Sequence, residues 1–122
     1  MNDRFFIDTN ILVYANDLSS PDKQRRSREI VAEALSTRRG CLSTQVLQEF
    51  FVVVTRKAGV AAPNARSQVV ALSDLDTVVI NAELVLSAID LHLIHGLSFW
   101  DALIVKAAGA AGCDRLLTED LN

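Results

Sequence analysis

The sequence contains 122 residues, of which 50% are hydrophobic and only two are proline, a composition that excludes a disordered or fibrous chain. This length fits a single domain spanning residues 1–122, with a real core and too little chain for two ordinary domains. The net charge of −3 excludes a simple basic nucleic-acid binder, and no apolar run approaches the roughly 20 residues that would span a membrane.

The hydrophobic pattern of the first half of the chain predicts two short strands and three helical segments. They are a buried strand over 4–8, one or two helical turns over 9–16, an amphipathic helix over 23–36, a strand over 41–43 and a helix over 44–57. Ser43 or Thr44 caps the last helix, because both are favoured N-cap residues. We expect Gly40 to end the helix over 23–36 as a C-terminal stop.

The second half predicts three further helices and two strands, namely a helix over 63–75, a strand over 77–80, a helix over 82–95, a helix over 99–111 and a strand over 115–118. Asn81 caps the second of these helices, and Ser98 with Asp101 forms a capping box for the third. Short apolar strands separated by helices are typical of a three-layer α/β/α fold with a mainly parallel central sheet. In such sheets, sites collect at the carboxyl ends of the strands.

Four carboxylates lie at the borders of apolar runs: Asp8, Glu49, Asp101 and Asp120. A carboxylate at the edge of a packed core is costly unless a cation or hydrogen-bond donors stabilise it. Several carboxylates at one place repel each other unless a divalent ion holds them together. The pattern therefore predicts a site for a hard metal ion.

Each acid also has a simpler explanation. Asp8 and Asp101 are placed to cap helices, and Asp120 is placed as a turn residue. Glu49 is harder to explain in this way, because its helical neighbours three and four residues away include no cation. We therefore expect Glu49 and Asp101 to be stabilised from elsewhere, most economically by a divalent ion.

Charge and cysteine content bear on partners and compartment. Residues 23–57 hold eight lysines and arginines against three glutamates, so this stretch either steers a phosphate backbone or forms a solvated helix face. Cys41 and Cys113 lack CxxC spacing and are predicted to be buried free thiols. The start of the chain has no features of a secretory signal, so we expect a cytoplasmic protein with no membrane association.

Taken together, the acidic motifs resemble a known family. The matching segments are Asp8-Thr9-Asn10 after a hydrophobic strand, Glu49 within residues 45–50, Asp101 within residues 97–104, and Thr118-Glu119-Asp120-Leu121. In this order they resemble the PIN domain, and more narrowly the VapC-type ribonuclease toxins of prokaryotic toxin–antitoxin pairs. The likeness covers essentially the whole chain. Family members usually continue into a further short strand, so we expect a C-terminal edge strand to be missing here.

The resemblance implies metal-dependent hydrolysis of RNA phosphodiester bonds. Asp8, Asp101 and Asp120 would hold Mg²⁺ or Mn²⁺, and Glu49 would complete the acidic set, while Glu119 competes with Asp120 for the last ligand position. The residues expected to orient carboxylates or waters are Thr9, Asn10, Ser43 and Thr118. The implied partners are an RNA substrate, a cognate antitoxin protein and a second copy of the chain.

Two other functions compete with the nuclease. A non-catalytic PIN-like module that binds RNA or protein predicts a missing acid, whereas all four acids are present. A phosphatase with an aspartyl nucleophile usually shows Asp-x-Asp after the first strand, whereas position 10 is Asn. The sequence therefore favours the nuclease.

Overall fold

Four short parallel strands form the central sheet of the computed structural model, which describes residues 2–119. They are β1 (Phe5–Ile7), β2 (Gly40–Ser43), β3 (Asp76–Val78) and β4 (Arg115–Leu117), in the order β3-β2-β1-β4. Phe6 of β1 pairs with Cys41 of β2 on one side and with Leu116 of β4 on the other. Because every pairing is parallel, the carboxyl ends of the strands lie at the same edge of the sheet.

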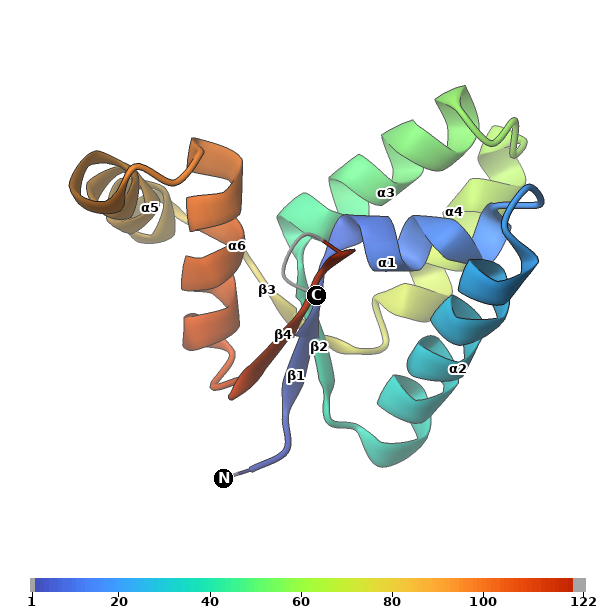
Figure 1. Cartoon of the computed structure of the whole chain (residues 1–122), viewed down its shortest axis with the longest axis horizontal. Coiled ribbons are helices and arrows are strands. Elements are labelled where there is room, and N and C mark those ends of the chain that lie inside the picture. The colour runs from blue at the N-terminus through green and yellow to red at the C-terminus, as the bar shows by residue number, and fades with distance from the viewer. Residues whose placement is uncertain (1, 120–122) are drawn as a thin grey trace.

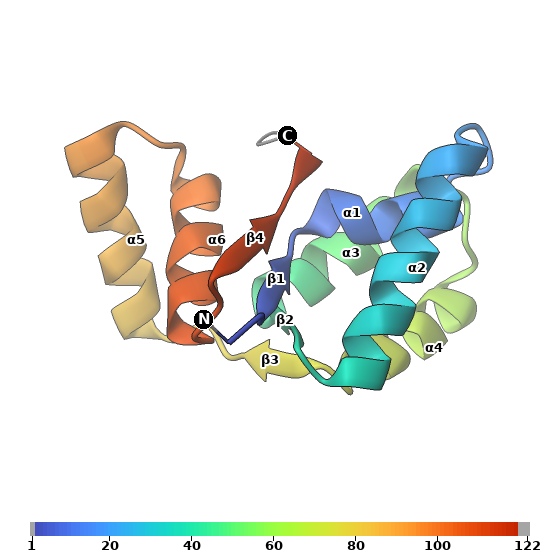
Figure 2. The ribbon, with the colours of Figure 1, turned by 60° about the horizontal axis from the view of Figure 1, so that its bottom comes forward.

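Helices cover both faces of the sheet. The described residues form α1 (Thr9–Val13), the 3₁₀ helix η1 (Tyr14–Asn16), α2 (Pro21–Thr37), α3 (Thr44–Arg56), α4 (Ala62–Leu72), α5 (Ala82–His95) and α6 (Phe99–Ala110). Figures 1 and 2 show α1 to α4 on one side of the sheet and α5 and α6 on the other. The predicted three-layer α/β/α architecture with a parallel sheet is confirmed. No helix among the described residues has both the length and the apolar character needed to cross a bilayer.

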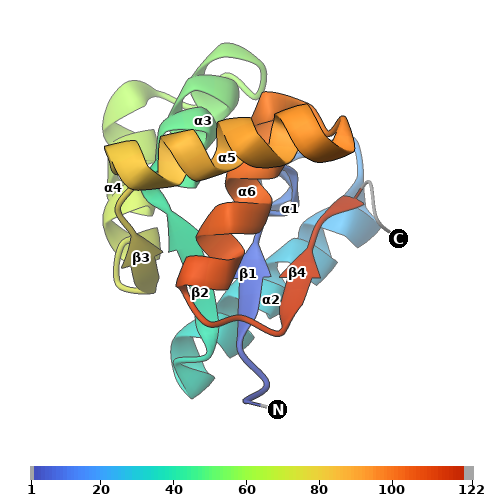
Figure 3. The same ribbon diagram turned by 90° about the vertical axis from the view of Figure 1, so that its left-hand side faces the viewer.

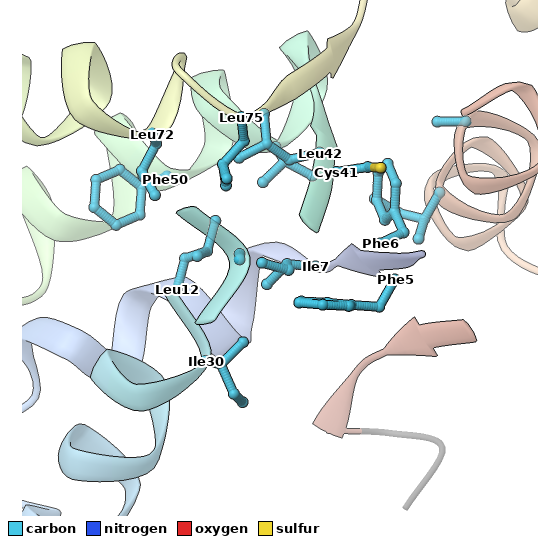
Figure 4. Packing of buried hydrophobic residues seen from close by; sticks show 14 of the residues in the cluster. Phe5, Phe6, Ile7, Leu12, Ile30, Cys41, Leu42, Phe50, Leu72 and Leu75 are labelled. Carbon is cyan, nitrogen blue, oxygen red and sulfur yellow. The ribbon is translucent and has the colours of Figure 1, made fainter. Parts of the chain in front are cut away.

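The main core includes residues of α1 to α4 on one face of the sheet and Ile104, Ala107 and Ala108 of α6 on the other. All three residues of β1 are buried, as expected for a central parallel strand that helices cover on both faces. Ile7, Leu12 and Phe50 are among the buried side chains labelled in Figure 4. A smaller cluster of Ala88, Ala102 and Leu103 joins α5 to α6.

Most predicted helix starts are confirmed by their caps. The hydroxyl group of Ser43 accepts a hydrogen bond from the backbone N–H of Val46, 3.3 Å away, at the start of α3. Asn81 accepts from Leu84 at the start of α5, at 2.9 Å. These contacts span only three residues, so the local sequence is enough to specify them.

The expected role of Gly40 was wrong. Arg38, with φ of 59°, takes the left-handed position that ends α2, and Gly40 lies within β2. A Cβ atom at Gly40 would come within 2.2 Å of the Ala34 Cβ atom, so glycine is required there for close packing of α2 against the strand.

The third strand is also shifted from its expected position. Residues 77–80 were expected to be extended, whereas β3 spans Asp76–Val78. The backbone N–H of Ile80 donates instead to the hydroxyl of Thr44, at 3.1 Å. A side chain from another element therefore replaces the sheet partner of this residue.

Both cysteines are free thiols, as predicted, although only Cys41 is fully buried and Cys113 is half-buried. Burial, together with the adjacent Cys41 thiol, raises the pKa of Cys113 to about 12. Cys113 is therefore a protonated thiol near neutral pH.

Candidate functional site

Asp8 lies where the central strand β1 ends. Its backbone N–H donates to the carbonyl oxygen of Leu117 in β4 at 3.0 Å, which ties the residue to the neighbouring strand. Its side chain accepts a 2.6 Å hydrogen bond from the backbone N–H of Thr9 at the start of α1. The capping role that the sequence allowed for Asp8 is therefore real, and it holds the carboxylate at the carboxyl edge of the sheet.

The electrostatic surroundings of Asp8 link it to two other predicted acids. The pKa of Asp8 is raised, chiefly because burial disfavours the ionised carboxylate. Hydrogen bonds from the Thr9 backbone and the Thr118 side chain act against this, whereas the negative charges of Glu49 and Asp101 raise the pKa further. Asp8, Glu49 and Asp101 come from three separate segments, and the last two lie near enough to affect the ionisation of Asp8.

Glu49 is held by two buried, neutral donors. The Thr9 hydroxyl donates to Oε2 of Glu49 at 3.1 Å, and Nε2 of Gln45 donates to Oε1 at 2.9 Å. Thr9 and Gln45 are only 4% and 5% exposed. The expectation that Glu49 depends on a cation for stabilisation needs correction, because an amide four residues earlier and a hydroxyl from α1 already donate hydrogen bonds to its two carboxylate oxygens.

Asp101 differs from the other two acids in being exposed, in the first turn of α6. Its backbone N–H donates to the hydroxyl of Ser98 at 3.1 Å, which is the serine half of the predicted capping box. Among the described residues its carboxylate has no hydrogen bond or ion pair. Asp101 is therefore accessible to a ligand from solvent.

The residues expected to orient the acids behave differently from one another. Thr9 contacts both Asp8 and Glu49, and Thr118 contacts Asp8. The hydroxyl of Ser43 instead caps α3, and the exposed Asn10 contributes its backbone carbonyl group to the end of α1. Within residues 2–119, no hydrogen bond joins the side chain of Ser43 or Asn10 to an acid.

The two candidates for the last acidic position are adjacent in sequence. Glu119 accepts hydrogen bonds from the Tyr14 hydroxyl at 2.6 Å and from the Lys23 ammonium group at 3.1 Å. The hydrogen bond from Tyr14 and then that from Lys23 lower the pKa of Glu119. Asp120 lies outside the described residues.

The described part of the chain does not by itself form a complete metal site. No three His, Cys, Asp or Glu side chains within residues 2–119 are placed to hold one ion together. The carboxylate oxygens of Asp8, Glu49 and Asp101 nevertheless match the hard oxygen ligands that Mg²⁺ and Mn²⁺ prefer. The donor chemistry of these three carboxylates fits such an ion.

Sequence reasoning missed Gln45. It lies four residues before Glu49, a spacing at which helix side chains face each other, but only cations were considered at that position. Its Oε1 atom is buried without a hydrogen-bond partner among the described residues. A glutamine four residues before an acid in a predicted helix was the signal that could have identified it.

The basic segment is partly a solvated helix face. On α2, Arg25 pairs with Asp22 and Glu29, at 3.3 and 3.9 Å, and Arg26 pairs with Glu29 at 3.5 Å. All these side chains are exposed, so their pairing contributes little to stability. The simpler explanation of the charge pattern holds for these two arginines.

Comparisons with known proteins agree with the fold. The Mycobacterium tuberculosis protein VapC20, described as a toxin that cleaves the sarcin-ricin loop, has a similar structure with a TM-score of 0.68 and 18% sequence identity. The match covers 95% of this chain and 91% of that one. No curated protein sequence matches the chain. The PIN domain family model matches residues 5–122, and the chain therefore belongs to the PIN domain family.

Proposed function

We propose that this protein is a metal-dependent endoribonuclease and the toxin of a toxin–antitoxin pair. The observation that carries the proposal is the placement of Asp8 at the carboxyl edge of the sheet, where Thr9 bonds to both Asp8 and Glu49 and the charges of Glu49 and Asp101 act on Asp8. Acids that repel each other at the carboxyl edge of a parallel sheet favour a bound cation. Membership of the PIN family, and a fold like that of a toxin described as cleaving the sarcin-ricin loop, support the same activity.

The residues have distinct proposed roles. Asp8, Asp101 and Asp120 would hold Mg²⁺ or Mn²⁺, directly or through waters, and Glu49 would complete the acidic surface. When bound, the ion lowers the pKa of a water molecule and offsets negative charge on the phosphate oxygens. Thr9 holds Asp8 and Glu49 in place, and exposure of Asp101 leaves room for the RNA phosphate.

Glu119 is the weaker candidate for the last ligand. Both of its carboxylate oxygens already accept hydrogen bonds, one from Tyr14 and one from Lys23. Binding an ion would require Glu119 to give up these bonds. This engagement supports Asp120 as the fourth acid.

A cognate antitoxin would keep the enzyme inactive. An open, almost wholly apolar groove of about 400 Å³ lies between α3 and α4, where Leu47, Phe51 and Val52 face Val69. An amphipathic helix of the antitoxin could place its apolar side chains there.

A homodimer is proposed for the opposite side of the molecule. Helix α5 lies across α6, away from the sheet (Figure 3). Leu93 and Ile94 are 73% and 74% exposed, and Leu86 and Trp100 are also exposed. These four residues, called the α5 patch below, leave apolar surface that a second copy would cover.

The direct test is cleavage of RNA by the purified protein in the presence of Mn²⁺, with EDTA as a second condition. Asp8→Asn and Asp101→Asn should each abolish the metal-dependent cleavage. Asp74→Asn is the matched control, because Asp74 is exposed and precedes β3, at the opposite end of the sheet.

Metal-dependent cleavage that survives both substitutions would refute the assignment. Titration with Mn²⁺ in the absence of RNA separates the nuclease from the alternative, a non-catalytic PIN-like module. The module binds RNA or protein without taking up Mn²⁺, whereas the nuclease takes up the ion before any RNA is supplied.

A further inference from the structure

Gln45 presents a buried acceptor beside the acidic residues. It lies in the first turn of α3 and is 5% exposed. Its Nε2 atom donates to Oε1 of Glu49 at 2.9 Å, while its Oε1 atom has no partner among the described residues. Burying a carbonyl oxygen without a donor destabilises a fold, so this arrangement calls for an explanation.

Glu49 determines which way the amide faces. An ionised carboxylate only accepts hydrogen bonds, so Gln45 must turn its NH₂ group toward Glu49. The second oxygen of Glu49 is taken by the Thr9 hydroxyl. Thr9 and Gln45 together hold Glu49 in one orientation, and the same geometry directs the carbonyl oxygen of Gln45 away from it.

We propose that Gln45 is a positioning residue for the cation that the acidic residues take up. Its amide nitrogen, together with the Thr9 hydroxyl, fixes the carboxylate of Glu49 beside Asp8, and its unpaired Oε1 atom follows from that orientation. A carboxylate that is already held in one orientation loses less conformational entropy when the cation binds. The inference rests on the proposed metal-dependent function and adds a residue outside the acidic set.

A merely structural role for Gln45 gives a different expectation. A glutamine that only stabilises α3 through its contact with Glu49 would lower the melting temperature when replaced and leave metal affinity unchanged. A positioning residue weakens metal binding when replaced. Its loss changes stability little, because an unpaired buried oxygen is removed together with one hydrogen bond.

The test measures the affinity of the RNA-free, full-length protein for Mn²⁺, by calorimetry or by electron paramagnetic resonance, together with the melting temperature. Gln45→Met keeps the length of the side chain and removes both polar groups. We expect its affinity for Mn²⁺ to fall about 10-fold or more, in line with other residues that orient metal ligands. Thr9→Val should act in the same direction, and Thr9→Ser should restore affinity because it keeps the hydroxyl group.

Gln68→Met is the matched control. Gln68 is a half-buried glutamine on α4 whose amide exchanges hydrogen bonds with Asn16, at 2.8 and 3.0 Å. Its replacement should lower the melting temperature and leave the affinity for Mn²⁺ within about twofold of the wild type. If Gln45→Met does not fold, Gln45→Asn provides the same test, because the shorter side chain no longer reaches Glu49.

The outcomes separate the two proposals. Unchanged affinity in a folded Gln45 variant, with Mn²⁺ bound normally by the wild type, overturns the role of Gln45 and leaves the nuclease intact. A wild-type protein that takes up no Mn²⁺ overturns the metal-dependent function and this inference with it.

Discussion

Tyr14 and Glu119, 105 residues apart in the sequence, share a 2.6 Å hydrogen bond. Lys23 joins them through Nζ, 3.1 Å from the Glu119 carboxylate and 4.7 Å from the centre of the Tyr14 ring. The preceding residue, Thr118, contacts Asp8 instead. Thr118 and Glu119 are therefore adjacent in sequence but make contacts in different places. Thr118 bonds within the acidic site, and Glu119 bonds to Tyr14 and to Lys23 of α2.

This division predicts different effects for the two adjacent acids. Asp120→Asn should lower RNA cleavage by roughly 100-fold or more, the loss typical of removing one charge-stabilising group from an active site. Glu119→Gln should keep most of the activity, because glutamine can still bond to Tyr14 through its amide. Cleavage rates under Mn²⁺ measure both. A larger loss in Glu119→Gln than in Asp120→Asn would reverse the assignment.

Asp8→Asn is expected to stabilise the metal-free fold at neutral pH. Burial and the charges of Glu49 and Asp101 raise the pKa of Asp8 in the folded state. A carboxyl group with a raised folded-state pKa contributes its full stability below the unfolded-state pKa, and this contribution is lost as pH rises through the folded-state pKa. Asparagine does not titrate and can still accept the hydrogen bond from Thr9, so the variant avoids this loss.

Urea unfolding in EDTA between about pH 4 and pH 8 measures the effect, since ordinary aspartates titrate near the lower limit. The difference in the free energy of unfolding between Asp8→Asn and the wild type should grow as pH rises. Saturating Mn²⁺ should reverse the order, because a cation favours the ionised carboxylate. A difference that stays constant across this range would contradict the prediction, and Asp74→Asn serves as the control.

Gly40→Ala should destabilise the protein by about 2 kcal/mol or more, because its Cβ atom would overlap Ala34 where α2 meets β2. Gly109→Ala is the opposite case. Gly109 lies in α6 and has no atom within 4 Å of an added Cβ atom. Alanine should stabilise that helix by roughly 0.5–1 kcal/mol. Urea midpoints of unfolding compare the two variants. A Gly40→Ala variant with an unchanged midpoint would contradict the prediction, because it would show that α2 can move away from β2 without loss of stability.

The α5 patch predicts a dimer that a single charge can dissociate. Leu93→Lys should convert a dimer into a monomer, because an ammonium group cannot be buried in an apolar interface without a partner. Leu18→Lys is the control, since Leu18 is exposed but lies in the loop before α2. Light scattering after size-exclusion chromatography gives the mass. A wild-type monomer, or equal dissociation by Leu18→Lys, would remove the α5 patch as the interface.

Local sequence was sufficient for much of the fold. The caps at Ser43 and Asn81 involve residues three positions away, and the helices follow hydrophobic patterns within a few turns. The alternation of short strands and helices also predicted the parallel three-layer arrangement, which the structure confirms. The hydrogen bond from Gln45 to Glu49 was available to the same kind of reasoning, because it spans four residues of one helix.

The sequence by itself determined which segments become helices and strands and which acids follow them, because those preferences come from neighbouring residues. Only the tertiary structure decided that Thr9 bonds to Glu49 from 40 residues away, that Glu119 turns toward Tyr14, and that Gly40 packs against Ala34. These contacts depend on strand order and on how closely helices approach the sheet. Chain neighbours carry no information about such distances, so they appear only when the whole chain has folded.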